Sequence, residues 1–352
     1  MKKISFVVPK VFQGNKIFDA EDTRVNRDNC LASAVALKEH LKSRQIDIST
    51  SDINPVKDAD LVIFENMPAL DNEDFVSAKR YRKKMFLNLT EWGALHPENE
   101  NLDRHQDFIR IFTYQDDLID NVKYIKINYS FQFPEKVDIP ASKKDKFCVM
   151  ISGYKRFRHP YELYSKRIEA IRWFEKNHPN EFDLYGLGWN GRPRLMHYPF
   201  MVKAINRIPG FFRLIDSGFP SYRGSIASKK EVLQHYKFAI CYENACDVNG
   251  WITEKIFDCF FAGCVPVYWG APNVADHIPK DAFLDKRDFS TYESLYDFLK
   301  NMTGEKYLDY LNAISAFMAS ERTKLFSIDY FVETMTSQIE QEIGAGVSSV
   351  YA

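Results

Sequence analysis

Short β-type runs alternate with segments of helical periodicity along most of this chain. In the first part, the apolar runs predict strands, and the stretches in which apolar residues recur every three to four positions predict helices. The strands are expected at residues 4–9, 46–50, 60–65, 84–91, 108–114 and 122–128, and the helices at 28–43 and 72–83. Strands that alternate with helices are typical of parallel sheets with helices on both faces. The expected fold class is therefore α/β.

The same alternation starts again after residues 134–146, a stretch with two prolines, alternating charge and no periodicity. Further strands are expected at 146–152, 182–186, 238–243 and 264–269, and helices at 161–177, 229–237, 253–263 and over most of 291–343. We therefore predict two Rossmann-like lobes, an N-terminal one at 1–140 and a C-terminal one at 141–352. Open parallel sheets bind ligands beyond the carboxyl ends of their strands, so chemistry is expected after Glu91, Ser152, Glu243 and Trp269.

Composition and charge narrow the class of protein. The 352 residues are 45% hydrophobic and 27% charged, which is ordinary for a soluble protein of two domains. The formal net charge of -1 argues against a general nucleic-acid binder. No window approaches the roughly 18 apolar residues of a membrane span, and the apolar run after Lys3 is too short for a signal peptide, so a cytoplasmic protein is expected. The six cysteines include no C-x-x-C pair and are expected to be reduced thiols.

The helix expected at 161–177 carries a charged residue in its apolar face. At about 100° per residue, Leu163, Ile168, Ile171 and Phe174 share one stripe, and Arg167 falls inside it. A buried guanidinium is costly unless it is paired, and its planar fork suits phosphate oxygens or a carboxylate. The pattern therefore indicates a diphosphate ligand, with pairing to a core Asp or Glu as the alternative.

Residues 236–274 combine a buried strand, a polar loop, a core helix and another strand. Thr253 is the expected N-cap of that helix, so Glu254 and Lys255 lie in its first turn. A helix N-terminus offers unpaired N–H groups and positive potential, and Lys255 adds a charge for a phosphate. Glu254 could accept hydrogen bonds from sugar hydroxyls, or it could merely complement the helix dipole.

This segment resembles the donor-binding signature of the bacterial α-1,3-fucosyltransferase family. The family pattern is a strand ending in F-E-N, then Y-[IV]-T-E-K on a helix, then a G-x-x-P-[IV] strand. The matching residues here are Tyr242-Glu243-Asn244, Trp251-Ile252-Thr253-Glu254-Lys255 and Gly263-Cys264-Val265-Pro266-Val267. The resemblance is strongest over 236–274, moderate over 147–173 and 85–129, and thin elsewhere.

The resemblance implies a glycosyltransferase-B fold with an N-terminal acceptor lobe and a C-terminal lobe for GDP-fucose. It also implies inversion at the anomeric carbon, with no essential cofactor and no bound metal. By position, Arg167, Asn244, Glu254 and Lys255 would contact the donor. Trp251 stands beside the nucleotide where the family usually has Tyr, which leaves other GDP sugars possible.

An inverting transfer also needs a base for the proton of the acceptor hydroxyl. Glu91 ends a predicted strand of the other lobe, and it resembles the catalytic glutamate of the family. Glu98 and Glu65 are the rival carboxylates. Because an acid at a strand end is often simply solvated, the assignment of Glu91 depends on the resemblance.

A basic and aromatic insert at 189–224 has no counterpart in the family pattern. It holds six Arg and Lys residues against one Asp, with aromatic residues between them. Such a segment suits either an anionic membrane surface with a lipid-linked acceptor or a solvated loop.

The function expected from these patterns is transfer of L-fucose from GDP-fucose to a glycan hydroxyl. An α-1,3 linkage and a surface glycan such as lipopolysaccharide O-antigen are expected, at the inner face of the cytoplasmic membrane. The acceptor would be an oligosaccharide or a lipid-linked glycan. The alternatives are a transferase for another GDP-6-deoxyhexose and a non-catalytic protein that binds a nucleotide sugar or a glycan.

Overall fold

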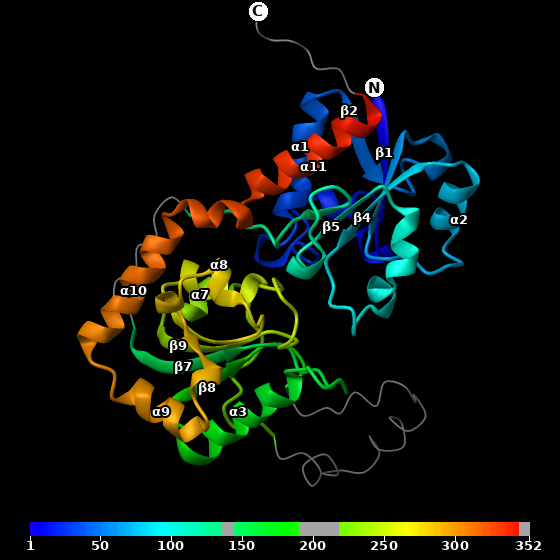
Figure 1. Ribbon diagram of the computed structural model, residues 1–352. Helices are drawn as coiled ribbons and strands as arrows, with labels where there is room; N and C mark the ends of the chain where they lie inside the picture. The colour runs from blue at the N-terminus through cyan, green and yellow to red at the C-terminus, as the bar shows by residue number, and fades with distance from the viewer. Residues whose placement is uncertain (135–143, 190–217, 345–352) are drawn as a thin grey trace, which may run out of the picture.

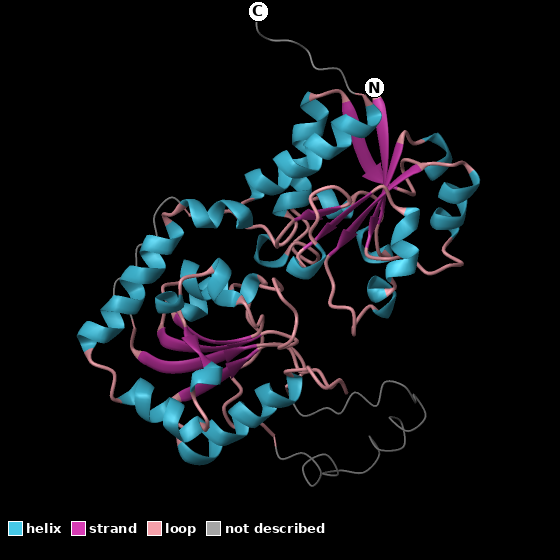
Figure 2. Ribbon diagram, in the orientation of Figure 1, coloured by secondary structure: helices cyan, strands magenta, loops and turns pink. Residues whose placement is uncertain are grey.

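The computed structural model describes residues 1–134, 144–189 and 218–344, which form two α/β lobes (Figure 1). Each lobe contains a parallel sheet with helices packed against it (Figure 2). The strands of the first lobe end at residue 126, and those of the second begin at residue 146. The α/β class predicted from the alternation of strands and helices is therefore confirmed.

The sheet of the first lobe has six strands in the order β2-β1-β3-β4-β5-β6, all parallel. The strands are β1 (Lys2–Val7), β2 (Ile46–Thr50), β3 (Leu61–Glu65), β4 (Lys84–Leu89), β5 (Arg110–Thr113) and β6 (Tyr124–Lys126). Four consecutive residues of β3 are buried, as expected of a central parallel strand that is covered on both faces. The carboxyl ends of β3 and β4 meet at one edge, from which Glu65 and Glu91 project.

The sheet of the second lobe has the order β11-β10-β9-β7-β8 and is also parallel. Its strands are β7 (Lys146–Ile151), β8 (Phe182–Tyr185), β9 (Tyr236–Tyr242), β10 (Val265–Trp269) and β11 (Leu284–Asp285). The sequence patterns predict the first four strands, and the two-residue β11 is too short to show a period. The central strands β9 and β10 place their carboxyl ends beside the start of the helix α7 (Glu254–Phe261).

The helices cover the sheets and then cross back between the lobes. They are α1 (Ala32–Ser43), α2 (Glu73–Arg80), α3 (Tyr164–Asn177), α6 (Lys229–Leu233), α8 (Val274–His277), α9 (Tyr292–Lys300), α10 (Gly304–Met318) and α11 (Ile328–Ile343). The last helix, α11, lies against α1 of the first lobe (Figure 1). Val332, Met335 and Ile339 share a core with residues of α1, and Glu340 pairs with Arg44 at 2.7 Å. The range predicted for the second lobe, 141–352, thus includes a helix that packs on the first.

An aromatic cluster joins the two lobes beside the loops at the sheet edges. Trp92 and Tyr114 of the first lobe surround Trp251 of the second, with ring centroids 5.9 and 6.0 Å from the Trp251 ring. Close by, the carboxylate of Asp116 accepts a hydrogen bond from His277 at 2.8 Å, which also crosses the interface. Packing and polar contacts therefore hold the two sheet edges next to each other.

Four other expectations concern the thiols, membrane spans, metal sites and the basic aromatic insert. The six cysteines are free thiols, and no helix in the described ranges is both long and apolar enough to traverse a bilayer. Within residues 1–134, 144–189 and 218–344, no cluster of His, Cys, Asp or Glu has the grouping that a metal ion would need. The basic aromatic insert lies outside the described residues except for its ends at residue 189 and residues 218–224.

Candidate functional site

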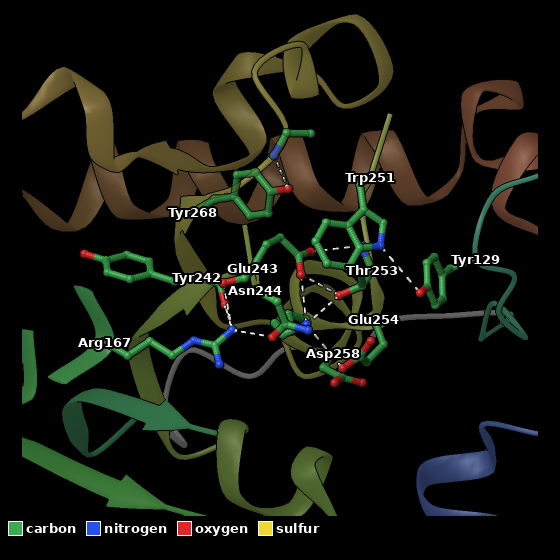
Figure 3. A network of polar contacts seen from close by, with 12 residues as sticks. Tyr129, Arg167, Tyr242, Glu243, Asn244, Trp251, Thr253, Glu254, Asp258 and Tyr268 are labelled. Carbon is green, nitrogen blue, oxygen red and sulfur yellow. Dashed lines mark hydrogen bonds and ion pairs between the residues drawn. The ribbon is translucent and has the colours of Figure 1, made fainter. Parts of the chain in front are cut away.

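The loop that follows β9 is built around a fully buried carboxylate, that of Glu243. Its Oε1 accepts the main-chain N–H of Thr253 at 2.9 Å, and its Oε2 accepts the Thr253 hydroxyl at 2.7 Å (Figure 3). The ammonium of Lys255 donates to the same Oε2 at 2.8 Å. A buried charge is tolerated only when it is paired and hydrogen-bonded. Glu243 therefore fixes both the start of α7 and the position of the Lys255 ammonium.

The first turn of α7 presents backbone N–H groups that its N-cap side chain does not bind. Thr253 is the N-cap residue, as the sequence predicts, but its hydroxyl donates to Glu243 and accepts no backbone N–H of the helix. The first N–H groups of a helix lack intrahelical partners and lie at the positive end of its dipole. Together with Lys255, this helix end has the chemistry of an anion site.

Glu254, the first residue of α7, lies between two lysines. Its Oε1 is 3.6 Å from the Lys255 ammonium and 3.7 Å from that of Lys229, and its side chain is 42% exposed. Desolvation alone would raise the pKa of Glu254, but the charges of Lys255 and Lys229 outweigh it and lower the pKa to about 2. Glu254 therefore stays ionised at neutral pH and can accept hydrogen bonds from hydroxyl groups.

A second carboxylate, that of Asp258, lies one turn further along α7 than Glu254 (Figure 3). The Lys229 ammonium donates to Asp258 at 2.7 Å. Burial raises the pKa of Asp258, and the neighbouring charge of Glu254 adds to that effect, so the pKa reaches about 6 although Lys229 opposes the shift. One ammonium thus stabilises two carboxylates, and the more exposed Glu254 is the one that keeps its charge to low pH.

Arg167 lies beneath the loop after β9, on the buried face of α3, and is 4% exposed. Its Nη2 donates to the carbonyl oxygens of Tyr242 and Glu243 at 2.7 Å and to Oδ1 of Asn244 at 2.9 Å (Figure 3). Burial lowers the pKa of this guanidinium. Among the residues that the structure describes, Nε and Nη1 have no hydrogen-bond acceptor and no carboxylate pairs with the group. Two donors of a buried cation therefore remain for a ligand.

Glu91 follows β4 on the other lobe, where the strand edges of the two lobes meet. Its side chain is exposed, yet desolvation raises its pKa, and the opposing influences include the positive charges of Lys155 and Lys255. The negative charge of Glu254 raises the pKa further. Lys155, Lys255 and Glu254 all belong to the second lobe, so the Glu91 side chain lies on the side of the first lobe that faces the second. Over the described ranges, no side chain pairs with its carboxylate.

The structure therefore brings Arg167, Asn244, Glu254 and Lys255 together around one loop, with Glu91 facing them. A hollow of about 480 Å³ adjoins the loop after β7 and is lined by Lys155, Arg156, Phe157, Arg158, Glu162, Ser165 and Ile168. Lys155 is both a wall of this hollow and one of the charges that Glu91 experiences. The hollow thus includes a residue whose charge acts on the candidate catalytic carboxylate.

Trp251, which the resemblance implies as a donor contact, does not belong to this open group. It is 2% exposed and stacks between aromatic residues of the first lobe. Its Nε1–H points to the hydroxyl of Tyr129 at 3.5 Å (Figure 3). That hydroxyl donates to the carbonyl oxygen of Thr90. An indole buried in this way connects the loop before α7 to the residue that precedes Glu91. Trp251 is thus buried between the lobes, which the sequence does not show, and its contact with the nucleotide stays a prediction.

The two rival carboxylates have different surroundings. Glu98 forms an ion pair with Arg104 at the surface and is 48% exposed. Glu65 lies at the same sheet edge as Glu91, and it accepts hydrogen bonds from Asn88 and from the Thr90 hydroxyl, each at 2.9 Å. Burial raises the pKa of Glu65. Both of its oxygens are thus engaged within its own lobe, unlike those of Glu91.

Sequence reasoning did not assign roles to Glu243, Lys229 or Asp258. Glu243 is quoted within the family pattern, and its place directly after an apolar strand was a signal that could have identified it. Asp258 lies one turn after Glu254 on the same helix, a spacing that puts both side chains on one face. Lys229 comes from a separate helix, so only the tertiary structure reveals it.

Comparison with known proteins gives the family of this chain. Residues 213–334 match the model described as glycosyltransferase family 10 (fucosyltransferase) C-term. Over 270 residues, or 67% of this chain, the sequence is 37% identical to the alpha-(1,3)-fucosyltransferase FucT of Helicobacter pylori. The match covers 54% of that protein, so this chain spans about half the length of that relative.

Two solved structures show the same architecture. A crystal structure of an alpha1,3-fucosyltransferase with GDP-fucose has a TM-score of 0.53 at 16% identity, and covers 99% of this chain and 92% of that one. HepE of Anabaena, solved with UDP-glucose, has a TM-score of 0.55 at 12% identity, with 97% and 100% covered. At these identities the likeness concerns the fold alone. With the family match, it shows that this chain carries the C-terminal domain of glycosyltransferase family 10, the fucosyltransferase family, on a glycosyltransferase-B fold.

Proposed function

We propose that this chain transfers L-fucose from GDP-fucose to a hydroxyl group of a glycan, with inversion at the anomeric carbon. The observation that carries the proposal is the placement of an unpaired carboxylate, Glu91, opposite a group of cations and donors around the start of α7. The family match supports a fucosyltransferase, and GDP-fucose is the ligand of one structure with the same fold.

The donor diphosphate would lie between Arg167 and the N-terminus of α7. The free Nε and Nη1 of Arg167, the ammonium of Lys255 and the first N–H groups of α7 are all positive. Glu243 links them, because its carbonyl oxygen accepts from Arg167 and its carboxylate accepts from Lys255 and from the N–H of Thr253. As the bond between the anomeric carbon and the phosphate oxygen breaks, negative charge grows on the departing GDP. Fixed positive groups at that position stabilise the transition state without reorganisation. Glu254, ionised across the physiological range, would accept hydrogen bonds from sugar hydroxyls.

Glu91 would act as the general base. The acceptor oxygen attacks the anomeric carbon on the face opposite the phosphate, GDP leaves with the bonding electrons, and the acceptor proton passes to the Glu91 carboxylate. Desolvation raises the pKa of Glu91, and a raised pKa brings a carboxylate closer to the pH at which proton transfer is efficient. No essential cofactor or metal is required in this scheme.

The remaining parts of the proposal concern the acceptor and the place of action. The expected acceptor is an oligosaccharide or lipid-linked glycan of a surface polysaccharide such as lipopolysaccharide O-antigen, fucosylated in α-1,3 linkage. The reaction would take place in the cytoplasm, with peripheral contact to the membrane. A panel of glycans tested with GDP-fucose would decide this part, and activity only on free monosaccharides would contradict it.

Two alternatives are tested by one donor experiment. A transferase for another GDP-6-deoxyhexose would bind its donor at the same diphosphate site. A binding protein would bind the nucleotide sugar but would not transfer the sugar. Thermal shifts with GDP, UDP and dTDP sugars identify the donor, and GDP release with oligosaccharide acceptors identifies turnover. We expect stabilisation by GDP-fucose and GDP release that depends on acceptor. A larger shift with UDP sugars, or binding without release, would overturn the proposal.

A further inference from the structure

Asn66 follows β3 at the sheet edge and has a left-handed backbone, with φ of 63°. Asparagine tolerates this conformation better than most residues with a side chain, but it is still uncommon. Asn66 is 8% exposed, and its own N–H donates to the carbonyl oxygen of Asn88 at 2.8 Å, which continues the pairing of β3 with β4. The left-handed turn directs its amide towards the residues that follow β4.

The side chain of Asn66 is fully engaged with those residues. Its Oδ1 accepts the main-chain N–H of Thr90 at 2.9 Å and that of Glu91 at 3.0 Å, and its Nδ2 donates to the Thr90 hydroxyl at 3.0 Å. Oδ1 also accepts from the amide of Asn99 at 2.9 Å, and Asn99 is 1% exposed. A single buried amide therefore has four hydrogen bonds to the segment that carries the candidate base and to its support.

The carbonyl group of Glu91 is held as firmly as its N–H group. Its oxygen accepts hydrogen bonds from the amide of Asn99 at 3.0 Å and from the hydroxyl of Tyr114 at 3.1 Å. Both polar groups of the Glu91 main chain are thus bound by buried side chains, whereas the Glu91 side chain is exposed. Satisfied buried polar networks are rigid, and a base that is positioned in advance loses little entropy during reaction.

We propose that Asn66 is a positioning residue that holds the main chain of Thr90 and Glu91, so that the Glu91 carboxylate stays aimed at the donor lobe. The expected effect of Asn66 on sugar transfer rests on the proposed function. The position that Asn66 gives to Glu91 does not depend on that function. A purely structural role for Asn66 would change stability without changing the surroundings of the Glu91 carboxylate. The two roles therefore differ in what they do to Glu91.

The first test compares Asn66→Gly with a matched control, Asn15→Gly. Glycine keeps the left-handed backbone but removes the amide, and Asn15 is another left-handed asparagine in the same lobe, with φ of 60°. Its Oδ1 accepts the N–H of Thr50 at 2.8 Å, away from Glu91. We expect N66G to lower kcat about 10- to 100-fold with little change in donor KM, because a base misplaced by about 1 Å costs rate of this order. N15G should lower stability and leave kcat unchanged.

The second readout does not need activity. In protein labelled with ¹³C at glutamate carboxyl carbons, the Glu91 signal is assigned by its loss in Glu91→Gln, and its pKa is measured by titration. N66G should bring the pKa of Glu91 down towards its ordinary value, and N15G should not. If the wild-type protein transfers no sugar, the proposed function fails, but this titration still tests Asn66. N66G with an unchanged Glu91 pKa and unchanged kcat would overturn the inference.

Asn66→Asp provides a variant that is expected to fold. Its carboxylate can still accept the N–H groups of Thr90 and Glu91, while its charge disfavours ionisation of Glu91 nearby. We expect most of the kcat to remain at high pH and the acidic limb of the rate profile to move up by about one pH unit. An N66D enzyme with the wild-type pH profile and wild-type Glu91 pKa would contradict the proposed contact.

Discussion

Replacing Lys255 with methionine removes one cation from the proposed diphosphate site while keeping an unbranched side chain that is one atom shorter. In the structure this ammonium lies 2.8 Å from Glu243 and 3.6 Å from Glu254, and its side chain is 20% exposed. A unit charge about 4 Å from a phosphate contributes about 4 kcal/mol at an effective dielectric constant of about 20. Because two carboxylates share the ammonium, about half of that is expected, or about a 30-fold weaker GDP affinity.

The same substitution has a structural cost that needs its own control. Without Lys255, the carboxylate of Glu243 stays fully buried with no cation, which destabilises a fold by about 3 kcal/mol. The double variant Glu243→Gln with Lys255→Met removes that charge, and the glutamine oxygen can still accept the N–H of Thr253 while its NH2 group donates to the Thr253 hydroxyl. We therefore expect the double variant to regain much of the thermal stability but none of the GDP affinity.

Isothermal titration calorimetry with GDP and thermal denaturation separate these two effects. The reasoning predicts weak binding by both variants and low stability of the single variant only. GDP affinity at the wild-type level in Lys255→Met would refute the diphosphate site. Recovery of affinity in the double variant would show that Lys255 acts through the fold and not on the ligand.

Three further changes have expected outcomes. Arg167→Lys keeps a charge but cannot donate to several acceptors at once, so both the GDP affinity and the urea midpoint of unfolding should fall. Wild-type values of both would argue that Arg167 neither binds the diphosphate nor supports the loop after β9. Asp258 has a raised pKa, about 6, so the native state binds more protons than the unfolded state between about pH 4 and 6, and the contribution of this group is lost as pH rises. Asp258→Asn should remove about 2 kcal/mol of that pH dependence, seen in unfolding at pH 4 and 7 with Lys229 unchanged, and identical slopes would contradict it. Asp116→Asn should weaken the contact with His277 and increase proteolysis between the lobes without changing GDP affinity; unchanged cleavage would show that the contact is not needed.

Much of the fold follows from local pattern. Continuous apolar runs predict central parallel strands such as β3 because burial on both faces leaves no alternation. The start of α7 is also visible, since Thr253 directly precedes an amphipathic helix. The position of Arg167 within an apolar stripe predicts its burial, which the structure confirms. In each of these cases, residues that are close in sequence determine the local structure.

Other features depend on contacts between distant segments and could not be predicted in this way. The helix α11 has an apolar face, but nothing in its sequence shows that the face packs on α1 of the first lobe. Trp251 occupies a position next to the donor motif, yet its ring is buried against Trp92 and Tyr114. The pairing of Lys229 with Glu254 joins two helices. Tertiary packing decides each of these outcomes, and a linear pattern contains no information on it.

The central claim is that Glu91 on one lobe accepts the proton while GDP departs from the other. Glu91→Gln tests it most directly, since the amide fills the same space but cannot act as a base. Donor affinity is measured by calorimetry, and turnover by GDP release from GDP-fucose with the most active glycan of the panel. The account predicts at least about a 100-fold loss of turnover, with donor affinity within about two-fold of the wild type. Turnover close to that of the wild type, or an equal loss of turnover and donor affinity, would contradict it.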